Sequence, residues 1–145
     1  VELSDATDTG LVPDFAWLSA KHARAAQGKT VASVYDGDYS SNACRIPMML
    51  AESGDSRAKK VMHKLLNFFN QQDVITAGYS LAGKQLNNYQ SNSFTAPLVF
   101  AASMDQQQSF SRILAKKQAI LTLSLQTNNY YDATLTTMAV MKGIQ

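Results

Sequence analysis

The sequence is short of the residues that mark several common protein classes. It contains one cysteine, two histidines and two glutamates among 145 residues. The single cysteine, Cys44, cannot form an internal disulfide. The histidines, His22 and His63, lie far apart, and neither belongs to a carboxylate–histidine pattern of the kind that binds zinc. We therefore predict neither a disulfide framework nor a metal site, and no motif indicates a cofactor.

Net charge and long apolar runs are equally scarce. The net charge is +2, charged residues make up 17% of the chain and hydrophobic residues 46%. Such a composition is typical of an ordered globular protein. No basic stripe with interleaved aromatic residues indicates nucleic-acid binding, and no apolar run approaches the ~20 residues that cross a bilayer. We predict a single globular domain over residues 1–145, with no nucleic-acid or membrane partner.

Hydrophobic periodicity indicates a mainly helical protein. The clearest helix covers residues 55–71, where apolar residues at helical spacing follow Asp55, a residue type favoured at the N-cap. Further helices are predicted over the ranges 15–27, 46–51, 95–104, 105–125 and 131–141. A short strand is predicted at 30–34 and a β-hairpin at 74–86, with Gly83-Lys84 at its turn. The predicted fold class is all-α, with antiparallel helical hairpins and one short β-hairpin.

Residues 35–53 are the stretch around which we interpret the rest of the chain. Aromatic and acidic residues alternate from Tyr35 to Tyr39, and small polar residues then lead into an apolar helical run. Serine and asparagine before such a run favour a helix start, because their side-chain oxygens accept hydrogen bonds from the free N–H groups of the first turn. Pro47 fits in that first turn, where its missing N–H costs little. Polar and aromatic groups at the start of a buried helix are suited to binding a sugar.

Residues 41–47, Ser-Asn-Ala-Cys-Arg-Ile-Pro, resemble the Tyr-Asp-Ala-x-Arg-x-Pro signature of family 8 glycoside hydrolases, the inverting cellulases, xylanases, chitosanases and lichenases. Three further segments resemble that family in the same order, at residues 10–15, 91–105 and 129–135. The resemblance implies an (α/α)6 barrel, an extracellular location and hydrolysis, with inversion, of β-1,4-linked polysaccharide of the cellulose, xylan or chitosan type. A polysaccharide or oligosaccharide substrate is therefore the expected partner.

The family's general base is the aspartate of the Tyr-Asp-Ala segment, and the matching position in this chain is Asn42. An amide cannot take a proton from water, so we expect Asn42 to orient a water molecule or a sugar hydroxyl instead. A subgroup that includes chitosanases resembles this chain in having asparagine at that position and taking its base from elsewhere. The chain either belongs to such a subgroup or has lost activity.

Three residues around Asn42 complete the candidate centre. Asp38 is the best replacement base, because it is a carboxylate four residues before Asn42 and close to two tyrosines. Its alternative role is to form a turn beside Gly37. We expect Arg45 either to orient Asn42 or a carboxylate through its guanidinium, or to form a structural ion pair. Tyr39, next to Asp38, is a candidate substrate-binding residue.

A second group of candidates lies near the C-terminal end of the sequence. Tyr130 and Tyr131 are suited to stacking on sugar rings or hydrogen-bonding them, or else they pack in the core where the last helix begins. Asp132 is either the N-cap of that helix or a site residue. Tyr89, in a polar loop, is either a sugar-stacking residue or an ordinary surface tyrosine.

The general acid of the family has no counterpart in this sequence. Inverting glycosidases need an acid and a base about 6.5–9.5 Å apart. The two glutamates, Glu2 and Glu52, are expected to be solvated, and no segment matches the family's Ser-Glu-Gly-type acid motif. A barrel of twelve helices also needs roughly 200–300 residues.

We therefore expect the chain to be the C-terminal half of a family 8-like barrel that is inactive in isolation. Half of a barrel exposes apolar surface, which favours pairing with a missing N-terminal half or with a second copy. The alternatives are a non-catalytic glycan-binding module and a helical interaction domain.

Overall fold

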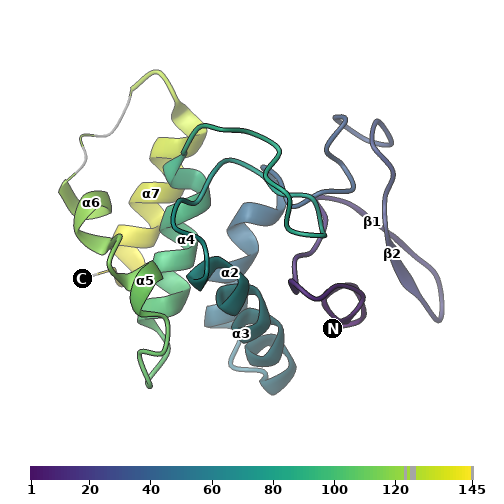
Figure 1. Ribbon diagram of the computed structural model, residues 1–145, viewed down its shortest axis with the longest axis horizontal. Helices are drawn as coiled ribbons and strands as arrows, with labels where there is room; N and C mark the ends of the chain where they lie inside the picture. The colour runs from purple at the N-terminus through teal and green to yellow at the C-terminus, as the bar shows by residue number, and fades with distance from the viewer. Residues whose placement is uncertain (123, 125–126, 145) are drawn as a thin grey trace.

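The computed structural model describes residues 1–122, 124 and 127–144, and the protein is mainly helical (Figure 1). The principal helices are α2 (Ile46–Glu52), α3 (Ser56–Asn70), α4 (Asn92–Ser103) and α7 (Tyr130–Lys142). The shorter helices are α1 (Glu2–Asp5), the 3-10 helix η1 (Ala43–Arg45), α5 (Ser111–Leu114) and α6 (Lys117–Thr122). Strands β1 (Ala16–Leu18) and β2 (Ala23–Ala25) pair antiparallel in one small sheet.

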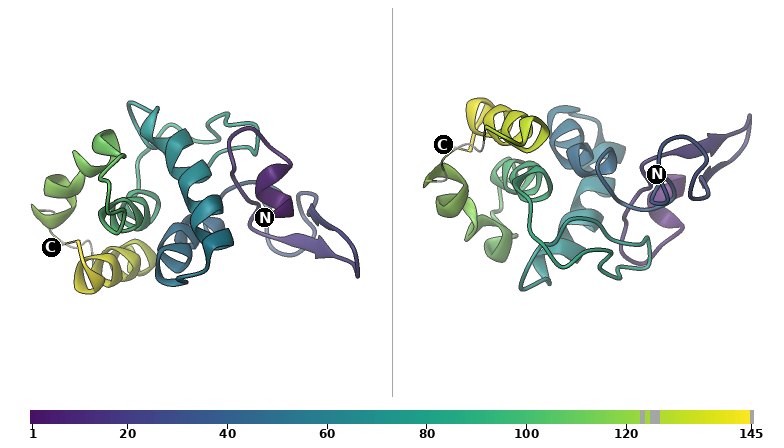
Figure 2. Two further views of the ribbon diagram at one scale, coloured as in Figure 1. Left: turned by 90° about the horizontal axis from the view of Figure 1, so that it is seen from below. Right: turned by 90° about the horizontal axis from the view of Figure 1, so that it is seen from above.

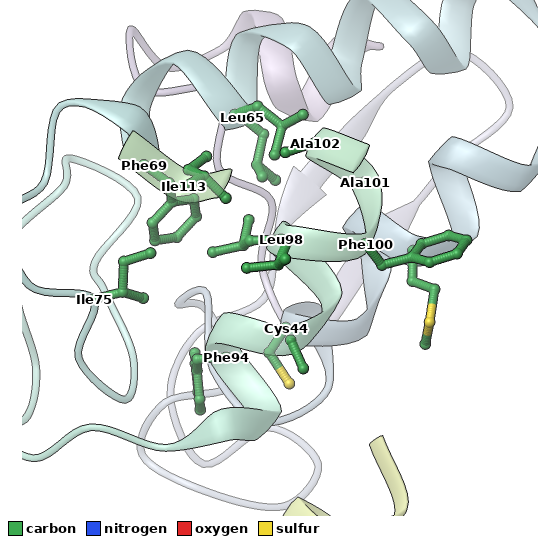
Figure 3. Packing of buried hydrophobic residues seen from close by; sticks show 14 of the residues in the cluster. Cys44, Leu65, Phe69, Ile75, Phe94, Leu98, Phe100, Ala101, Ala102 and Ile113 are labelled. Atoms are coloured by element: carbon green, nitrogen blue, oxygen red, sulfur yellow. The ribbon is translucent and has the colours of Figure 1, made fainter. Parts of the chain in front are cut away.

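Helix α4 lies at the centre of the helical body. Every residue from Ser93 to Ala102 is buried, so this part of the helix has no face open to solvent. Helices α2 and α7 pack against it, and both views of Figure 2 show α4 and α7 side by side. Leu65 and Phe69 of α3 belong to the same buried cluster as Leu98 of α4 (Figure 3). A helix that is apolar on all sides is expected in such a core.

Helix α3 forms where the periodicity predicts it. The carboxylate of Asp55 accepts a hydrogen bond from the N–H of Arg57 at 2.7 Å, as the N-cap of this helix. An apolar stripe faces the core: Val61, Met62, Leu65, Leu66 and Phe69 are buried. The prediction for residues 55–71 is confirmed, and so is the final helix predicted over 131–141, which is α7.

Helix α4 begins three residues earlier than the predicted range 95–104. Pro97 therefore lies inside the helix rather than in its first turn, where it leaves the carbonyl of Ser93 without its usual helical donor. The start of α4 is fixed by Asp132 of α7, whose carboxylate accepts from the N–H of Ser93 at 2.7 Å. A cap that another helix supplies cannot be predicted from the local sequence pattern.

The helix predicted over residues 15–27 is wrong, because this segment contains the β1–β2 hairpin that projects from the helical body (Figure 1). The N–H of Phe15 donates to the carbonyl of Asp36 at 2.9 Å. The hydroxyl of Ser19 accepts from the N–H of His22 at 3.0 Å and closes the turn between the strands. These tertiary and turn hydrogen bonds outweigh the helix propensity of the alanines in the segment.

The short strand predicted at residues 30–34 is also wrong. The N–H groups of Val31, Ala32 and Ser33 donate to the carboxylate of Asp36, which folds the segment into a turn. An aspartate that binds nearby backbone in this way offers the chain an alternative to a strand ladder.

The β-hairpin predicted at residues 74–86 is reduced to isolated bridges, of Tyr79 with Tyr39 and of Tyr79 with Gln85. Its predicted turn at Gly83 is present, with φ at +91°. A Cβ atom at this position would lie 2.8 Å from the ring of Phe68, so both the backbone and the packing favour glycine. In the described residues, the one regular sheet is instead β1–β2.

The single helix predicted over residues 105–125 is divided into α5 and α6, and residues 123, 125 and 126 lie outside the described part of the chain. Asp105 caps neither helix. Its buried carboxylate accepts from the N–H of Ser109 at 3.0 Å and lies 3.5 Å from the imidazole of His63. The coarse prediction of a mainly helical fold is confirmed, and the small β-hairpin is present at β1–β2 rather than at residues 74–86. Over the residues that the structure describes, no helix has both the length and the apolarity to cross a bilayer.

Candidate functional site

Asp14 holds the chain at the point where α2 begins. Its Oδ1 atom accepts from the N–H groups of Ser40 at 2.9 Å, Asn42 at 3.1 Å and Ala43 at 2.8 Å. These donors lie at the start of η1, which leads directly into α2. The free N–H groups at a helix N-terminus favour a negative charge. Asp14 is therefore the cap of this helical segment, supplied from a distant part of the chain.

The polar run that ends at Asn42 was expected to mark a helix start, but the side chain of Asn42 does not cap the helical segment. It occupies the N-cap of η1 with no side-chain hydrogen bond to the turn. Its Oδ1 accepts from the guanidinium of Arg45 at 3.1 Å, and its Nδ2 lies 3.5 Å from Oδ2 of Asp14. The Nε of Arg45 also donates to the carbonyl of Asn42 at 3.1 Å. Arg45 therefore contacts Asn42 directly, while the catalytic and substrate-binding roles of both residues stay predictions.

Asp38 lies beside Asp14, since its carbonyl accepts from the N–H of Asp14 at 2.8 Å. Burial raises the pKa of the Asp38 carboxyl above its ordinary value, and the negative charge of Asp14 raises it further. A raised carboxyl pKa brings proton transfer closer to neutral pH, as general acid–base catalysis requires. The role of Asp38 as a replacement base stays a prediction.

Asp36 has a structural role instead. Only 1% of it is exposed, and its carboxylate accepts from three consecutive N–H groups at Val31, Ala32 and Ser33. Burial alone would raise the pKa of this carboxyl, but the backbone hydrogen bonds outweigh burial and hold the pKa below its usual value. Asp36 therefore stays ionised and fully engaged by the turn.

Tyr131 connects the last helix to the turn that precedes α2. Its hydroxyl donates to the carbonyl of Ser41 and lies 3.6 Å from Sγ of Cys44. Burial raises the pKa of the Cys44 thiol to about 11. Burial, followed by the contact with Cys44, raises the pKa of the Tyr131 hydroxyl above its usual range. Both groups are therefore neutral at physiological pH, and the Tyr131 hydroxyl keeps the proton that it donates.

A pocket of about 490 Å³ opens where α4 and α7 begin. It is lined by hydroxyl, amide and aromatic groups that include Ser41, Tyr89, Gln90, Ser91, Asn92, Asn129, Tyr131 and Asp132. The carboxylate of Asp132 accepts from the hydroxyl of Ser91 at 2.5 Å. Asp132 thus caps α4, and the N-cap of its own helix is Asn129, whose side chain accepts from the N–H of Asp132 at 3.1 Å. Such groups are suited to hydrogen-bonding and stacking on sugars.

A second hollow of about 280 Å³ lies between α2 and α7, and we call it the α2–α7 groove. Arg45, Tyr130 and Tyr131 line it together with methionines of both helices. Tyr130 is 84% exposed and Tyr131 38% exposed, so the alternative that these tyrosines pack in the core is wrong. Tyr131 borders both the pocket and the groove. The structure therefore brings Arg45, Tyr130 and Tyr131 together, with Asn42 bound to Arg45.

The side chain of Tyr39 does not reach the surface, so the structure gives no support to its predicted substrate-binding role. Its side chain is fully buried and packs against the rings of Phe69 and Phe94, with centroid distances of 5.4 and 6.2 Å. The backbone bridge between Tyr39 and Tyr79 fixes the segment in this position. Alternation of aromatic and acidic residues in the sequence does not reveal which of them faces the core.

Asn42 and Asp38 line neither hollow, as far as the described residues show. Asn42 nevertheless directly follows Ser41, which lines the pocket and accepts the hydrogen bond of Tyr131. Over residues 1–122, 124 and 127–144, no three or more His, Cys, Asp or Glu side chains gather where they would hold a metal ion.

Comparison with known proteins places the chain in a family. The family model described as "Glycosyl hydrolases family 8" matches residues 1–143. The chain belongs to this family. A "Beta-glucanase" from Niallia circulans is 30% identical to the family 8 chain over 105 residues, which cover 66% of the chain and 26% of the relative.

Part of a solved structure has the same fold as this family 8 chain. It is an apo structure of a beta-1,3-1,4-glucanase from Paenibacillus sp. X4, with a TM-score of 0.73 and 25% sequence identity. The match covers 95% of the family 8 chain and 39% of the glucanase. The chain thus spans about a quarter of the length of the first relative and two fifths of the second.

Two residues that the structure places at the site, Asp14 and Ser91, are not among the site residues predicted from the sequence. Asp14 lies within the segment 10–15 that resembles the family, and Ser91 begins the segment 91–105. Motif position is therefore the signal that would have pointed to them. Their partners are far away in the sequence, at Ala43 and Asp132, and spacing along the chain does not reveal such pairs.

Proposed function

We propose that this family 8 chain forms the sugar-binding wall of a glycoside hydrolase that cleaves β-1,4-linked polysaccharide by single displacement with inversion. In this proposal the chain is the C-terminal part of an (α/α)6 barrel, and the general acid belongs to helices beyond these 145 residues. A β-glucan is the favoured substrate, because the two relatives are named for glucanase activity. Action on a polymer also favours an extracellular location.

One observation carries the proposal: the pocket and the α2–α7 groove meet at Tyr131, beside the segment 41–47 that resembles the family signature. The pocket supplies hydroxyls, amides and the ring of Tyr89. The groove supplies the exposed ring of Tyr130 and the guanidinium of Arg45. A saccharide longer than one ring would contact both hollows across Tyr131.

The proposed chemistry distributes the roles among few residues. Asn42 orients the attacking water, and Asp38, with its raised pKa, takes the proton as base. The glutamates do not supply the acid in this proposal. Glu2 binds the imidazole of His22 at 3.2 Å, and Glu52 binds the ammonium of Lys142 at 2.5 Å. We therefore expect the isolated chain to bind oligosaccharide without cleaving it.

Calorimetric titration with cello-, xylo- and chito-oligosaccharides and with mixed-linkage β-glucan oligomers tests this proposal. We expect saturable binding that Tyr130→Ala and Tyr131→Ala each weaken by about tenfold, the loss of roughly one stacking contact. Tyr35→Ala is the matched control, because Tyr35 lines neither hollow in the described residues. Unchanged affinity in both tyrosine variants would refute the proposed site. Hydrolysis by the isolated chain would refute the proposal that its general acid lies outside these 145 residues.

A non-catalytic glycan-binding module is the second candidate, and the amide at position 42 favours it. An asparagine where the family has its base leaves binding intact while removing proton transfer. Expression together with the coding sequence upstream of Val1 distinguishes the two candidates. Inverting hydrolysis that Asp38→Asn abolishes supports the enzyme, and binding without hydrolysis in that longer protein supports the module.

A further inference from the structure

We propose that Asp14 is the positioning residue of this site, because its carboxylate holds the turn before α2 and orients the side-chain amide of Asn42. That Asn42 contacts water or sugar rests on the proposed function. The positioning itself rests on hydrogen bonds that involve no ligand.

The backbone hydrogen bonds show that Asp14 holds the turn at the start of η1. A residue at an N-cap ordinarily turns its side-chain oxygen back to accept from the N–H groups of the first turn. Asn42 occupies that position in η1 but makes no such bond, and its own N–H donates to Asp14. The carboxylate of Asp14 instead holds the backbone of this turn through the donors at Ser40, Asn42 and Ala43. The N–H of Cys44, which an N-cap side chain would bind, donates to the carbonyl of Ser40 at 2.9 Å, so the side chain of Asn42 is left to face other partners.

The two neighbours of the Asn42 amide then determine its orientation. A guanidinium only donates hydrogen bonds and a carboxylate only accepts them. The oxygen of Asn42 must therefore face Arg45, and its nitrogen must face Asp14, as the distances of 3.1 and 3.5 Å indicate. This arrangement leaves the amide one N–H and one lone pair, which are the groups needed to hold a water molecule or a hydroxyl.

Asp14 is also connected to the other candidate residue in this region. Its N–H donates to the carbonyl of Asp38 at 2.8 Å. Its negative charge adds to the effect of burial in raising the pKa of the Asp38 carboxyl. One carboxylate thus acts on both residues that the proposed chemistry uses, although it is not among the residues that line either hollow.

The variant Asp14→Asn tests the proposal, because it keeps an oxygen acceptor for the turn and removes the charge. We expect the fold to persist by circular dichroism. In NMR spectra of labelled protein we expect the side-chain amide signals of Asn42 to shift, and the pKa of the Asp38 carboxyl to fall toward its ordinary value. Asp36→Asn is the matched control, since it changes a buried carboxylate that caps the neighbouring turn, and it should leave the Asn42 side-chain signals in place.

Asn42→Ala is the second test, and it holds even if Asp14→Asn does not fold. If Asp14 is the cap, removing the Asn42 amide should leave the melting temperature and the backbone N–H signals of Ser40 and Ala43 unchanged. A marked fall in melting temperature would mean that Asn42 itself supports the turn and would overturn the proposal. Unchanged Asn42 and Asp38 signals in a folded Asp14→Asn variant would also overturn it.

Oligosaccharide titration separates this proposal from the proposed function. If both hold, Asp14→Asn and Asn42→Ala should weaken binding by similar factors, of about tenfold, because they disturb the same amide. If the unaltered chain binds no oligosaccharide, the proposed function fails, and the NMR signals still decide whether Asp14 positions Asn42.

Discussion

Tyr130 and Tyr131 are adjacent in the sequence, and within the part of the chain that the structure describes only the hydroxyl of Tyr131 forms a hydrogen bond. The hydroxyl of Tyr131 donates to the carbonyl of Ser41, whereas the side chain of Tyr130 is mostly in solvent. We expect Tyr131→Phe to lower the free energy of unfolding by about 1 kcal/mol, the usual net contribution of one such hydrogen bond. Tyr130→Phe is the control and should change it by less than about 0.3 kcal/mol. Urea denaturation measures both changes in the free energy of unfolding. Equal changes would contradict a stabilising hydrogen bond from the Tyr131 hydroxyl.

The buried thiol of Cys44 predicts how the free energy of unfolding changes at alkaline pH. Its thiol has an ordinary pKa of 9.0, and burial raises this to about 11 in the folded protein. Because the folded pKa is above the unfolded one, the contribution to stability is complete below pH 9 and is lost as the pH rises toward 11. We expect the free energy of unfolding to fall over this window by about 2 kcal/mol more in the unaltered protein than in Cys44→Ala.

Denaturant titrations of both proteins at several pH values measure this difference. The comparison uses the slope with pH rather than the absolute stability, because Cys44→Ala also leaves a cavity. Parallel slopes in the two proteins would show that the thiol is not protected from ionisation by the fold.

At the scale of helices, Asp132 stabilises a helix to which it does not belong. Its carboxylate caps α4 through Ser91 and Ser93 while it is itself in the first turn of α7. We expect Asp132→Ala to lower the free energy of unfolding by about 1–2 kcal/mol, the usual cost of a lost N-cap, and Asp132→Asn to lower it less. Asp5→Ala removes only an exposed ion pair with Lys60 and should cost about 0.5 kcal/mol or less. Thermal and urea unfolding provide the comparison.

Helices that carry their own signals could be predicted from the sequence, and helices or strands set by distant partners could not. Residues 55–71 combine an N-cap aspartate with an apolar stripe, and both features appear in α3. Residues 15–27 contain many alanines, yet the carbonyl of Asp36 and the turn at Ser19 make them a hairpin. Local propensity describes a preference of the isolated segment, and tertiary hydrogen bonds override it.

In the candidate site, too, some contacts can be predicted from the local sequence and others cannot. Arg45 lies one helical turn beyond Asn42, so their contact follows from local spacing. The role of Asp14 depends on a hydrogen bond to Ala43, which lies in a distant part of the sequence. The burial of Tyr39 depends on the backbone bridge that it forms with Tyr79. Neither follows from residues close by in the chain.

At the scale of the whole molecule, the α2–α7 groove is bordered by exposed apolar side chains, including Met49 and Met138. Exposed apolar surface favours association. We expect the isolated chain to self-associate with increasing concentration in sedimentation experiments, and Met49→Glu with Met138→Glu to weaken this. Leu18→Glu is the control, because Leu18 is more exposed than either methionine and does not line the groove. It belongs to β1, in the hairpin that projects from the helical body (Figure 1). A monomer at all concentrations would contradict this expectation.

The hydrogen bond between Tyr131 and Ser41 joins residues that are 90 positions apart in the chain. Contacts of such long sequence separation form slowly, because a large loop must close before they contribute. The turn that carries Asn42 therefore gains this support only once α7 has docked onto α4. We expect amide hydrogens of that turn to acquire protection late in refolding and to lose it early in partial unfolding, so that binding capacity would disappear before the core of α3 and α4 opens.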